Sequence, residues 1–129
     1  MIRGLGLRFV AGLILTASAV PMDGASAAEI GDLQMCVALR QIDDSRVIDD
    51  KTILLRMTSG TPYRRIDLDP ACPGLRMADS FSSATSIGQL CRSDVIRVHE
   101  DPVGSQCVID QIVIIDEAEA KTLLASRKR

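Results

Sequence analysis

The sequence predicts a mainly β fold, a small antiparallel β-barrel or sandwich with a short C-terminal α-helix and two disulfides. Turn-forming residues recur about every eight to twelve residues, which favours many short strands. Apolar and polar residues alternate in segments such as Tyr63–Leu68, as in half-buried strands. The 129 residues are 47% hydrophobic and 25% charged. This composition fits one globular domain and excludes collagen-like, coiled-coil and low-complexity chains.

Residues 1–27 have the layout of a secretory signal peptide. Two arginines precede an apolar run, Phe9–Val20, and the small residues Ala25–Ala27 provide a cleavage site. A helix of this run would reach only about 18 Å, whereas the hydrocarbon core of a bilayer is about 30 Å thick. We therefore expect cleavage after Ala27, leaving one exported domain, residues 28–129, without an integral membrane span. Its expected location is the periplasm or the extracellular medium.

The first half of the mature chain predicts a hairpin and two further strands. Arg46–Ile48 and Thr52–Met57 flank the turn sequence Asp49–Lys51. Tyr63–Leu68 alternates apolar and charged residues, which predicts a second pairing strand. Leu75–Phe81 is expected to form the next strand.

The second half predicts a loop, two long strands and the helix. Ser82–Ser86 is polar and is expected to form a loop. Leu90–His99 and Cys107–Ile115 are the strongest strand candidates. The end of the second, Ile112–Ile115, is apolar at every position, so both of its faces should be covered.

Residues 116–126 are expected to form the covering helix. Asp116 is a suitable N-cap, and Glu117 and Lys121 have the i,i+4 spacing of a favourable ion pair. One apolar stripe should face the sheet, formed by Ala120, Leu123 and Leu124.

All four cysteines follow the predicted signal peptide: Cys36, Cys72, Cys91 and Cys107. An even number in a small exported chain predicts two structural disulfides. Of the three pairings, we favour Cys72–Cys91, which closes a local loop, with Cys36–Cys107, which joins the ends of the β-rich region. Redox or zinc chemistry is the alternative, but no two cysteines have the C-x-x-C spacing.

The order of the cysteines and their flanking blocks resembles a family of small exported proteobacterial proteins of unknown function. The resemblance implies an exported β-rich fold and no activity, cofactor or catalytic residue. Ser93 stands where glycine would be expected, so the turn there should differ. The blocks that carry the resemblance are Cys36, Arg46–Ile53, Tyr63, Cys72–Leu75, Ala78–Ser80, Leu90–Ile96 and Cys107.

Charge and aromatic content exclude nucleic acid as the main partner. The full chain has a formal net charge of −2, and loss of residues 1–27 would leave 13 basic and 16 acidic residues, a net charge of −3. Nucleic-acid binding needs clustered Lys and Arg and often aromatic stacking. Only 2% of the chain is aromatic.

Four aspartates within eight positions are a candidate cation site. Asp43, Asp44, Asp49 and Asp50 could supply oxygen ligands to calcium. They lack the spacing of an EF-hand loop, however, and aspartate is common in turns for conformational reasons alone. The turn interpretation is preferred, and no metal or other cofactor is assigned.

His99 is the single histidine and the candidate general base. No nucleophile motif places a serine beside it, so we expect it to face solvent and assign no catalytic residue. Asp94, after Cys91, is instead expected to bind turn amides. The side chains that could in principle complete a catalytic set with His99 are Asp79, Asp94, Ser80, Ser82 and Ser83.

Several arginines are a candidate anion-binding spot, because guanidinium binds carboxylates and phosphates through paired hydrogen bonds. The preferred interpretation, however, is that they pair with neighbouring aspartates on the outer face of half-buried strands. The C-terminal Arg127–Arg129 could contact anionic lipid or fray. The residues of the candidate spot are Tyr63, Arg64 and Arg65, with Arg56 and Arg76.

These observations favour a non-enzymatic, disulfide-stabilised domain that binds or supports an unidentified component of the cell envelope. A thiol-redox or metal-binding protein of the periplasm is the alternative, and an envelope hydrolase using His99 is weaker. The ligand and the oligomeric state are not predicted.

Overall fold

The computed structural model describes residues 12–17, 29–83, 87–99 and 104–127. Most of the predicted signal peptide lies outside these residues. Its described part, residues 12–17, has no regular secondary structure. Among the described residues, no helix combines the length and the apolar character needed to cross a membrane.

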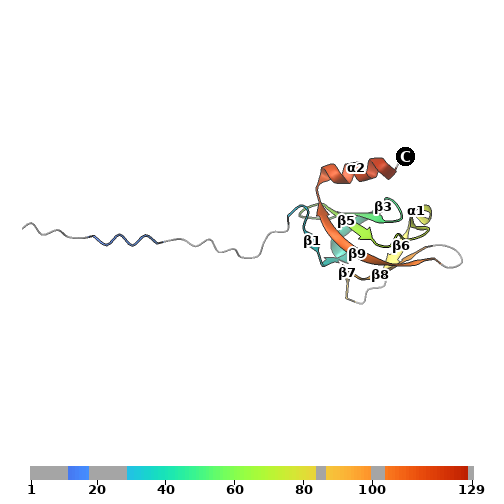
Figure 1. Ribbon diagram of the computed structural model, residues 1–129, viewed down its shortest axis with the longest axis horizontal. Helices are drawn as coiled ribbons and strands as arrows, with labels where there is room; N and C mark the ends of the chain where they lie inside the picture. The colour runs from blue at the N-terminus through green and yellow to red at the C-terminus, as the bar shows by residue number, and fades with distance from the viewer. Residues whose placement is uncertain (1–11, 18–28, 84–86, 100–103, 128–129) are drawn as a thin grey trace, which may run out of the picture.

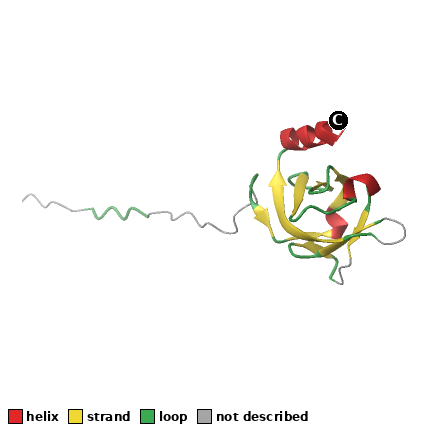
Figure 2. Cartoon of the chain, turned by 45° about the vertical axis from the view of Figure 1, so that its right-hand side comes forward, coloured by secondary structure: helices red, strands yellow, loops and turns green. Residues whose placement is uncertain are grey.

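The fold is mainly β, as predicted, with an antiparallel sheet that curls into a half-barrel (Figures 1 and 2). Its strands follow the order β3-β4-β5-β9-β8-β6, and β1 also pairs with β9. A separate two-stranded sheet pairs β2 with β7. The strands are β1 (Leu33–Gln34), β2 (Cys36–Ala38), β3 (Ile42–Val47), β4 (Thr52–Met57), β5 (Tyr63–Leu68), β6 (Phe81–Ser83), β7 (Gln89–Cys91), β8 (Val95–Val98) and β9 (Gln106–Ile115).

The long strand β9 joins the two halves of the sheet. Along one edge it pairs with β5, from Tyr63 opposite Ile115 to Leu68 opposite Ile109. Along the other edge its beginning pairs with β8 and its end with β1. Ile112–Ile115 is buried throughout, which confirms the prediction that this segment is covered on both faces.

Two apolar clusters lie on opposite faces of the sheet. The inner cluster fills the half-barrel, and its largest fully buried side chains include Ile53, Leu55 and Ile66. The outer cluster lies under the C-terminal helix and contains Ile48, Leu54, Val113, Ile115 and Ala120, with Tyr63, Leu123 and Leu124 packed against it.

The C-terminal helix α2 (Glu117–Arg127) lies across the outer face of the sheet (Figure 2). The Asp116 Oδ1 accepts the Glu119 N–H at 2.8 Å, so Asp116 caps the helix as predicted. Glu117 and Lys121 form the expected i,i+4 pair at 3.4 Å. The helix therefore begins and ends within one residue of the predicted bounds.

The predicted strand Leu75–Phe81 is wrong over most of its length. Leu75–Ala78 forms the single-turn helix α1, and β6 begins only at Phe81. Gly74 and Asp79 both have positive φ, 81° and 54°, at the two ends of this turn. The Arg76 N–H donates to the Asp50 Oδ1 at 2.8 Å, which satisfies a free amide at the start of the helix.

The boundaries of the following loop also differ from the prediction. Ser82 and Ser83 belong to β6 rather than to a loop, and residues 84–86 lie outside the described part. The short 3₁₀ turn η1 (Leu39–Gln41), which was not predicted, connects β2 to β3.

The predicted strand Leu90–His99 is two strands that belong to different sheets, β7 and β8. The chain breaks at Ser93, whose φ of 72° is left-handed. The Asp94 Oδ2 accepts the Cys91 N–H at 2.7 Å, so the predicted turn-capping role of Asp94 is confirmed. A glycine would adopt the conformation of residue 93 without steric cost.

Both disulfides form, but the favoured pairing is wrong. The bonds are Cys36–Cys91 and Cys72–Cys107. Cys36 lies directly opposite Cys91 in the pairing of β2 with β7. Cys72 follows β5, is fully buried and reaches Cys107 on β9. The preference for closing a local loop failed because strand pairing and burial, rather than distance along the chain, decide which thiols meet.

Replacement of Ser93 by glycine should stabilise the domain. A non-glycine residue in the left-handed conformation costs about 1–2 kcal/mol. Glycine avoids this cost, but it loses about 0.5–1 kcal/mol because its backbone gives up more conformational entropy on folding. We expect Ser93→Gly to raise the Tm by about 2–8 °C in thermal unfolding. Ser59→Gly is the control, because Ser59 is exposed and has no positive φ. An unchanged or lower Tm for Ser93→Gly would contradict the strain at this turn.

The two disulfides should differ in their effect on stability. Their sequence separations of 55 and 35 correspond to about 4 kcal/mol each in the chain-entropy model. Cys72→Ala with Cys107→Ala should cost more than Cys36→Ala with Cys91→Ala, because Cys72 and Cys107 belong to the inner core and their truncation leaves a cavity.

Urea unfolding of the two double variants measures this order, and non-reducing peptide mapping checks the pairing. The reverse order of stability, or a peptide linking Cys72 to Cys91, would contradict the structure.

Candidate functional site

A groove between α2 and the outer face of β3, β4 and β5 is the candidate binding site. Its volume is about 230 Å³, slightly below the 300–1,000 Å³ of pockets for drug-sized ligands. It is open to solvent along the edge strand β3. The lining residues are Asp44, Arg46, Leu54, Arg56, Tyr63, Leu124 and Arg127.

The register of the sheet brings these side chains together. Asp44 on β3 lies opposite Arg56 on β4, which lies opposite Tyr63 on β5. Side chains directly across neighbouring strands share a face at about 4.5–5.5 Å between Cβ atoms. The next row on the same face holds Arg46, Leu54 and Arg65.

Two arginines of the groove are held by carboxylates of the edge strand. Arg56 binds the Asp43 Oδ2 through Nη2 at 2.7 Å and through Nε at 2.8 Å. This hydrogen bond raises the pKa of Arg56. Arg46 Nε contacts the Asp44 Oδ2 at 3.2 Å. All four side chains are at least 40% exposed, so these pairs contribute little to stability.

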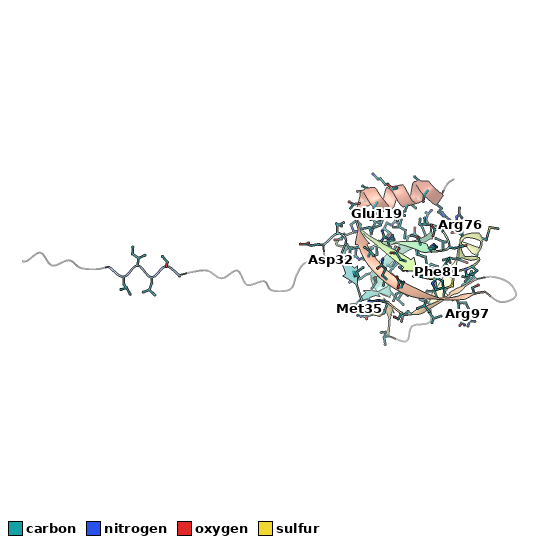
Figure 3. All side chains as sticks on the ribbon, viewed as in Figure 1. Asp32, Met35, Arg76, Phe81, Arg97 and Glu119 are labelled. Carbon is teal, nitrogen blue, oxygen red and sulfur yellow. A yellow bond between two sulfur atoms is a disulfide. The ribbon has the colours of Figure 1, made fainter. Side chains whose placement is uncertain are left out.

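A third arginine comes from the helix. Arg127 pairs with Asp79 through Nη2, and its Nε is buried with no hydrogen-bond acceptor among the described residues. Arg76 donates from Nη2 to the Arg127 carbonyl at 2.9 Å and so holds the last turn of α2 near α1. Figure 3 shows Glu119 near the start of the helix and Arg76 below its other end.

The inner wall of the groove is apolar. Leu54 is buried, whereas Tyr63 and Leu124 are half-buried and pack against the outer cluster. The groove thus changes from charged at β3 to apolar toward α2. Of its lining side chains, three are cationic and one is anionic, although the chain as a whole is acidic. Such a surface can bind a carboxylate or phosphate through guanidinium hydrogen bonds.

The predicted arginine spot is only partly assembled. Arg56 and Tyr63 line the groove, whereas Arg65 on the same face is engaged by Asp67 at 2.8 Å and by Glu119 of α2. The hydrogen bond to Asp67 raises the pKa of Arg65. Pairing with aspartate, the preferred interpretation, is therefore confirmed for Arg56 and Arg65.

Arg64 lies apart from the groove, on the inner face of β5. It is 8% exposed and donates from Nε to the Gln34 Oε1 at 2.6 Å. Its Nη1 donates to the carbonyls of Thr61 and Tyr63 at 2.7 and 3.0 Å. Burial lowers the pKa of Arg64. The residue therefore connects β1 to the turn before β5.

The predicted acidic cluster is dispersed. Asp43 and Asp44 occupy a bulge in the edge strand β3 and pair with arginines. The Asp49 Oδ1 accepts the Lys51 N–H at 2.8 Å, and Asp50 binds the Arg76 amide. The described residues contain no group of three or more His, Cys, Asp or Glu side chains that could hold a metal.

His99 lies after β8 and is exposed, as expected. Its N–H donates to the Ser80 carbonyl at 3.2 Å. Within the described part of the chain, no hydrogen bond joins its imidazole to the candidate serine or aspartate side chains. Asp79 instead pairs with Arg127, and Asp94 binds the Cys91 amide.

A second hollow of about 210 Å³ lies between the edge strands β3 and β6, where the half-barrel is open. No charged side chain lines it, and Phe81 from β6 forms part of its wall (Figure 3). Its other lining residues are Leu39, Ile42, Ser45, Leu55, Ser83 and Leu90.

The sequence did not reveal that Arg46 and Arg127 complete the groove. Arg46 carries no signal beyond its place in the hairpin, and Arg127 was assigned to a basic tail. The alternation of charged residues on β3 and β4 was the available clue, but the pairing of Asp44 with Arg56 depends on a bulge between Ile42 and Asp44.

The chain belongs to a family of unknown function (DUF6491), whose model matches residues 1–129. The resemblance inferred from the sequence is thus confirmed at the level of a family without an assigned role. No curated protein and no solved structure is significantly similar to the chain.

Replacement of Arg64 should destabilise the domain. Arg64→Lys keeps the charge but loses the fixed geometry that binds Gln34, Thr61 and Tyr63 together. We expect a loss of about 1–3 kcal/mol in the free energy of unfolding, measured by urea denaturation. Arg97→Lys, on an exposed position of β8, should stay within about 0.5 kcal/mol. Equal stability of the two variants would show that the hydrogen bonds of Arg64 do not contribute to the free energy of unfolding.

Proposed function

We propose that this member of a family of unknown function is a non-enzymatic binding domain of an oxidising compartment outside the cytoplasm. The two disulfides are consistent with such a location. The finer assignment, to the periplasm or the extracellular medium, rests on the predicted signal peptide, residues 1–27.

The observation that carries the proposal is the convergence of three arginines on an apolar wall. Arg46 and Arg56 come from the sheet and Arg127 from the helix, around Leu54 and Leu124. This lining offers hydrogen-bond donors and apolar contact, which are the elements of a binding pocket. It offers no pairing of a nucleophile with a base, so binding is supported better than catalysis.

The alternatives from the sequence have less support. A thiol-redox role would use cysteines that are all engaged in disulfides, with Cys72 fully buried. A metal-binding role would use Asp43, Asp44, Asp49 and Asp50, but the part of the chain that the structure describes contains no group of three or more His, Cys, Asp or Glu side chains that could hold a metal.

The test is native mass spectrometry of the protein after incubation with the low-molecular-weight fraction of a periplasmic extract. We expect a mass adduct on the wild-type protein that is lost in Arg56→Gln. Arg56 is exposed, so this variant should fold normally, which circular dichroism checks. Arg97→Gln is the matched control, because Arg97 lies on the side of the molecule opposite α2 (Figure 3), and it should retain the adduct.

Absence of any adduct on the wild-type protein would contradict the proposal. An adduct that persists in Arg56→Gln would place binding outside the groove and would equally contradict it.

A further inference from the structure

We propose that the groove beneath α2 binds an amphipathic anion, a phosphate monoester or carboxylate carried on an apolar body. The inference rests on the proposed function and names the class of ligand. The anionic head would lie among Arg46, Arg56 and Arg127, and the apolar body against Tyr63 and Leu124.

The groove changes polarity in one direction across the sheet. Across one row of the sheet the side chains run from Asp44 through Arg56 and Tyr63 to Ile115. Charge therefore lies at the β3 edge, and apolar surface lies at β9, where α2 packs. A ligand that crosses this row meets guanidinium groups at one end and carbon at the other.

The charges of the groove favour an anionic head. The groove lining contains one carboxylate, Asp44, and the carboxylates that bind Arg56 and Arg127 belong to Asp43 and Asp79, which lie outside the lining. The Arg56–Asp43 pair is exposed, and exposed ion pairs are worth about 0–1 kcal/mol each, so an incoming anion displaces this pair at small cost.

The arginines also retain unused donors. A guanidinium has five N–H donors, and Arg56 directs its Nε and Nη2 to Asp43. Arg127 has a buried Nε without an acceptor among the described residues. Since an unsatisfied buried donor is costly, the present position of Arg127 is not strongly favoured. A ligand oxygen would supply the missing acceptor after a small movement of this side chain.

The net charge of the chain and the apolar wall of the groove favour a small ligand with an apolar body. The chain has a net charge of −2 and a sequence pI of about 5.3, so its overall field repels extended polyanions. A bare inorganic anion would leave the apolar wall of Leu54, Tyr63 and Leu124 in contact with water. The volume of about 230 Å³ suits the head and the adjoining part of a chain or ring.

The experiment compares octyl phosphate with its two halves, inorganic phosphate and octanol, by isothermal titration calorimetry below the micellar concentration. Octanoate is a fourth probe that distinguishes a carboxylate from a phosphate head. We expect octyl phosphate or octanoate to bind at least tenfold more tightly than either half. The amide shifts in nuclear magnetic resonance should be confined to β3, β4, β5 and α2.

Two variants separate the head from the body. Arg56→Gln should weaken octyl phosphate binding at least tenfold, and Leu124→Ser should weaken it several-fold without affecting inorganic phosphate. Arg97→Gln and Leu33→Ser, which alter exposed residues outside the groove, should leave binding unchanged. Circular dichroism and thermal unfolding confirm that all four variants fold.

If inorganic phosphate binds as tightly as octyl phosphate, the ligand does not need an apolar body. If octanol binds as tightly as octyl phosphate, the ligand does not need an anionic head. Either result would overturn the proposal. If neither amphiphile binds while the wild-type protein still takes up a compound from the extract through Arg56, the ligand class is wrong and the proposed function stands.

Discussion

The pairing of β5 with β9, buried on the inner face of the sheet and half-covered by α2 on the outer face, is the contact on which the rest of the structure depends. Ile66 and Ile112 face the inner cluster, whereas Tyr63 and Ile115 face the outer one. Because β9 continues past the end of β5 to pair with β8, and also receives β1, the curl of the sheet follows from this one strand. Burial of a large aliphatic side chain contributes about 1.5–3 kcal/mol, so the Ile112–Ile115 segment of β9, which is buried throughout, fixes the register of its neighbours. A shift by one residue would turn each apolar side chain to the wrong face.

That fixed register also creates the groove. Arg56 faces outward because Leu55 and Met57 face the inner core, and the bulge in β3 then places Asp44 rather than Asp43 opposite Arg56. The bulge serves a second purpose, because charged residues and an irregularity on an edge strand oppose pairing with another chain. Asp43 and Asp44 are thus explained by edge protection and by ion pairing, without a cation. The disulfides stabilise the regions where the sheet itself gives least support: Cys36–Cys91 holds the separate β2–β7 pair, and Cys72–Cys107 anchors the loop before α1 to β9.

The sequence predicted the parts of the fold that follow from local pattern. The alternation in β5, the apolar end of β9 and the capped helix at Asp116 each carry their own signal, and the structure agrees with them. Leu75–Ala78 was mistaken for a strand because a four-residue helix has no periodicity to detect, and its position depends on Asp50, 26 residues away along the chain. The predicted strand Leu90–His99 ran through the turn expected at Ser93 and Asp94, because a non-glycine residue in a left-handed conformation gives no local signal that a strand ends there. Neither the disulfide pairing nor the arginine groove was predictable, since both are set by which strands become neighbours.

The groove also explains why the C-terminal helix is held so specifically. Burial of Ala120, Leu123 and Leu124 against the outer cluster would fix the height of α2 above the sheet, but apolar contact is not directional. Direction comes from polar contacts at both ends, Glu119 with Arg65 near the start and the Arg127 carbonyl with Arg76 at the end. These contacts hold Leu124 and Arg127 over Leu54 and Arg56, on elements separated by about 70 residues of sequence. A helix that only covered apolar surface would need no such alignment, whereas the proposed binding role requires it, because guanidinium groups recognise an anion only when they are held at a defined spacing.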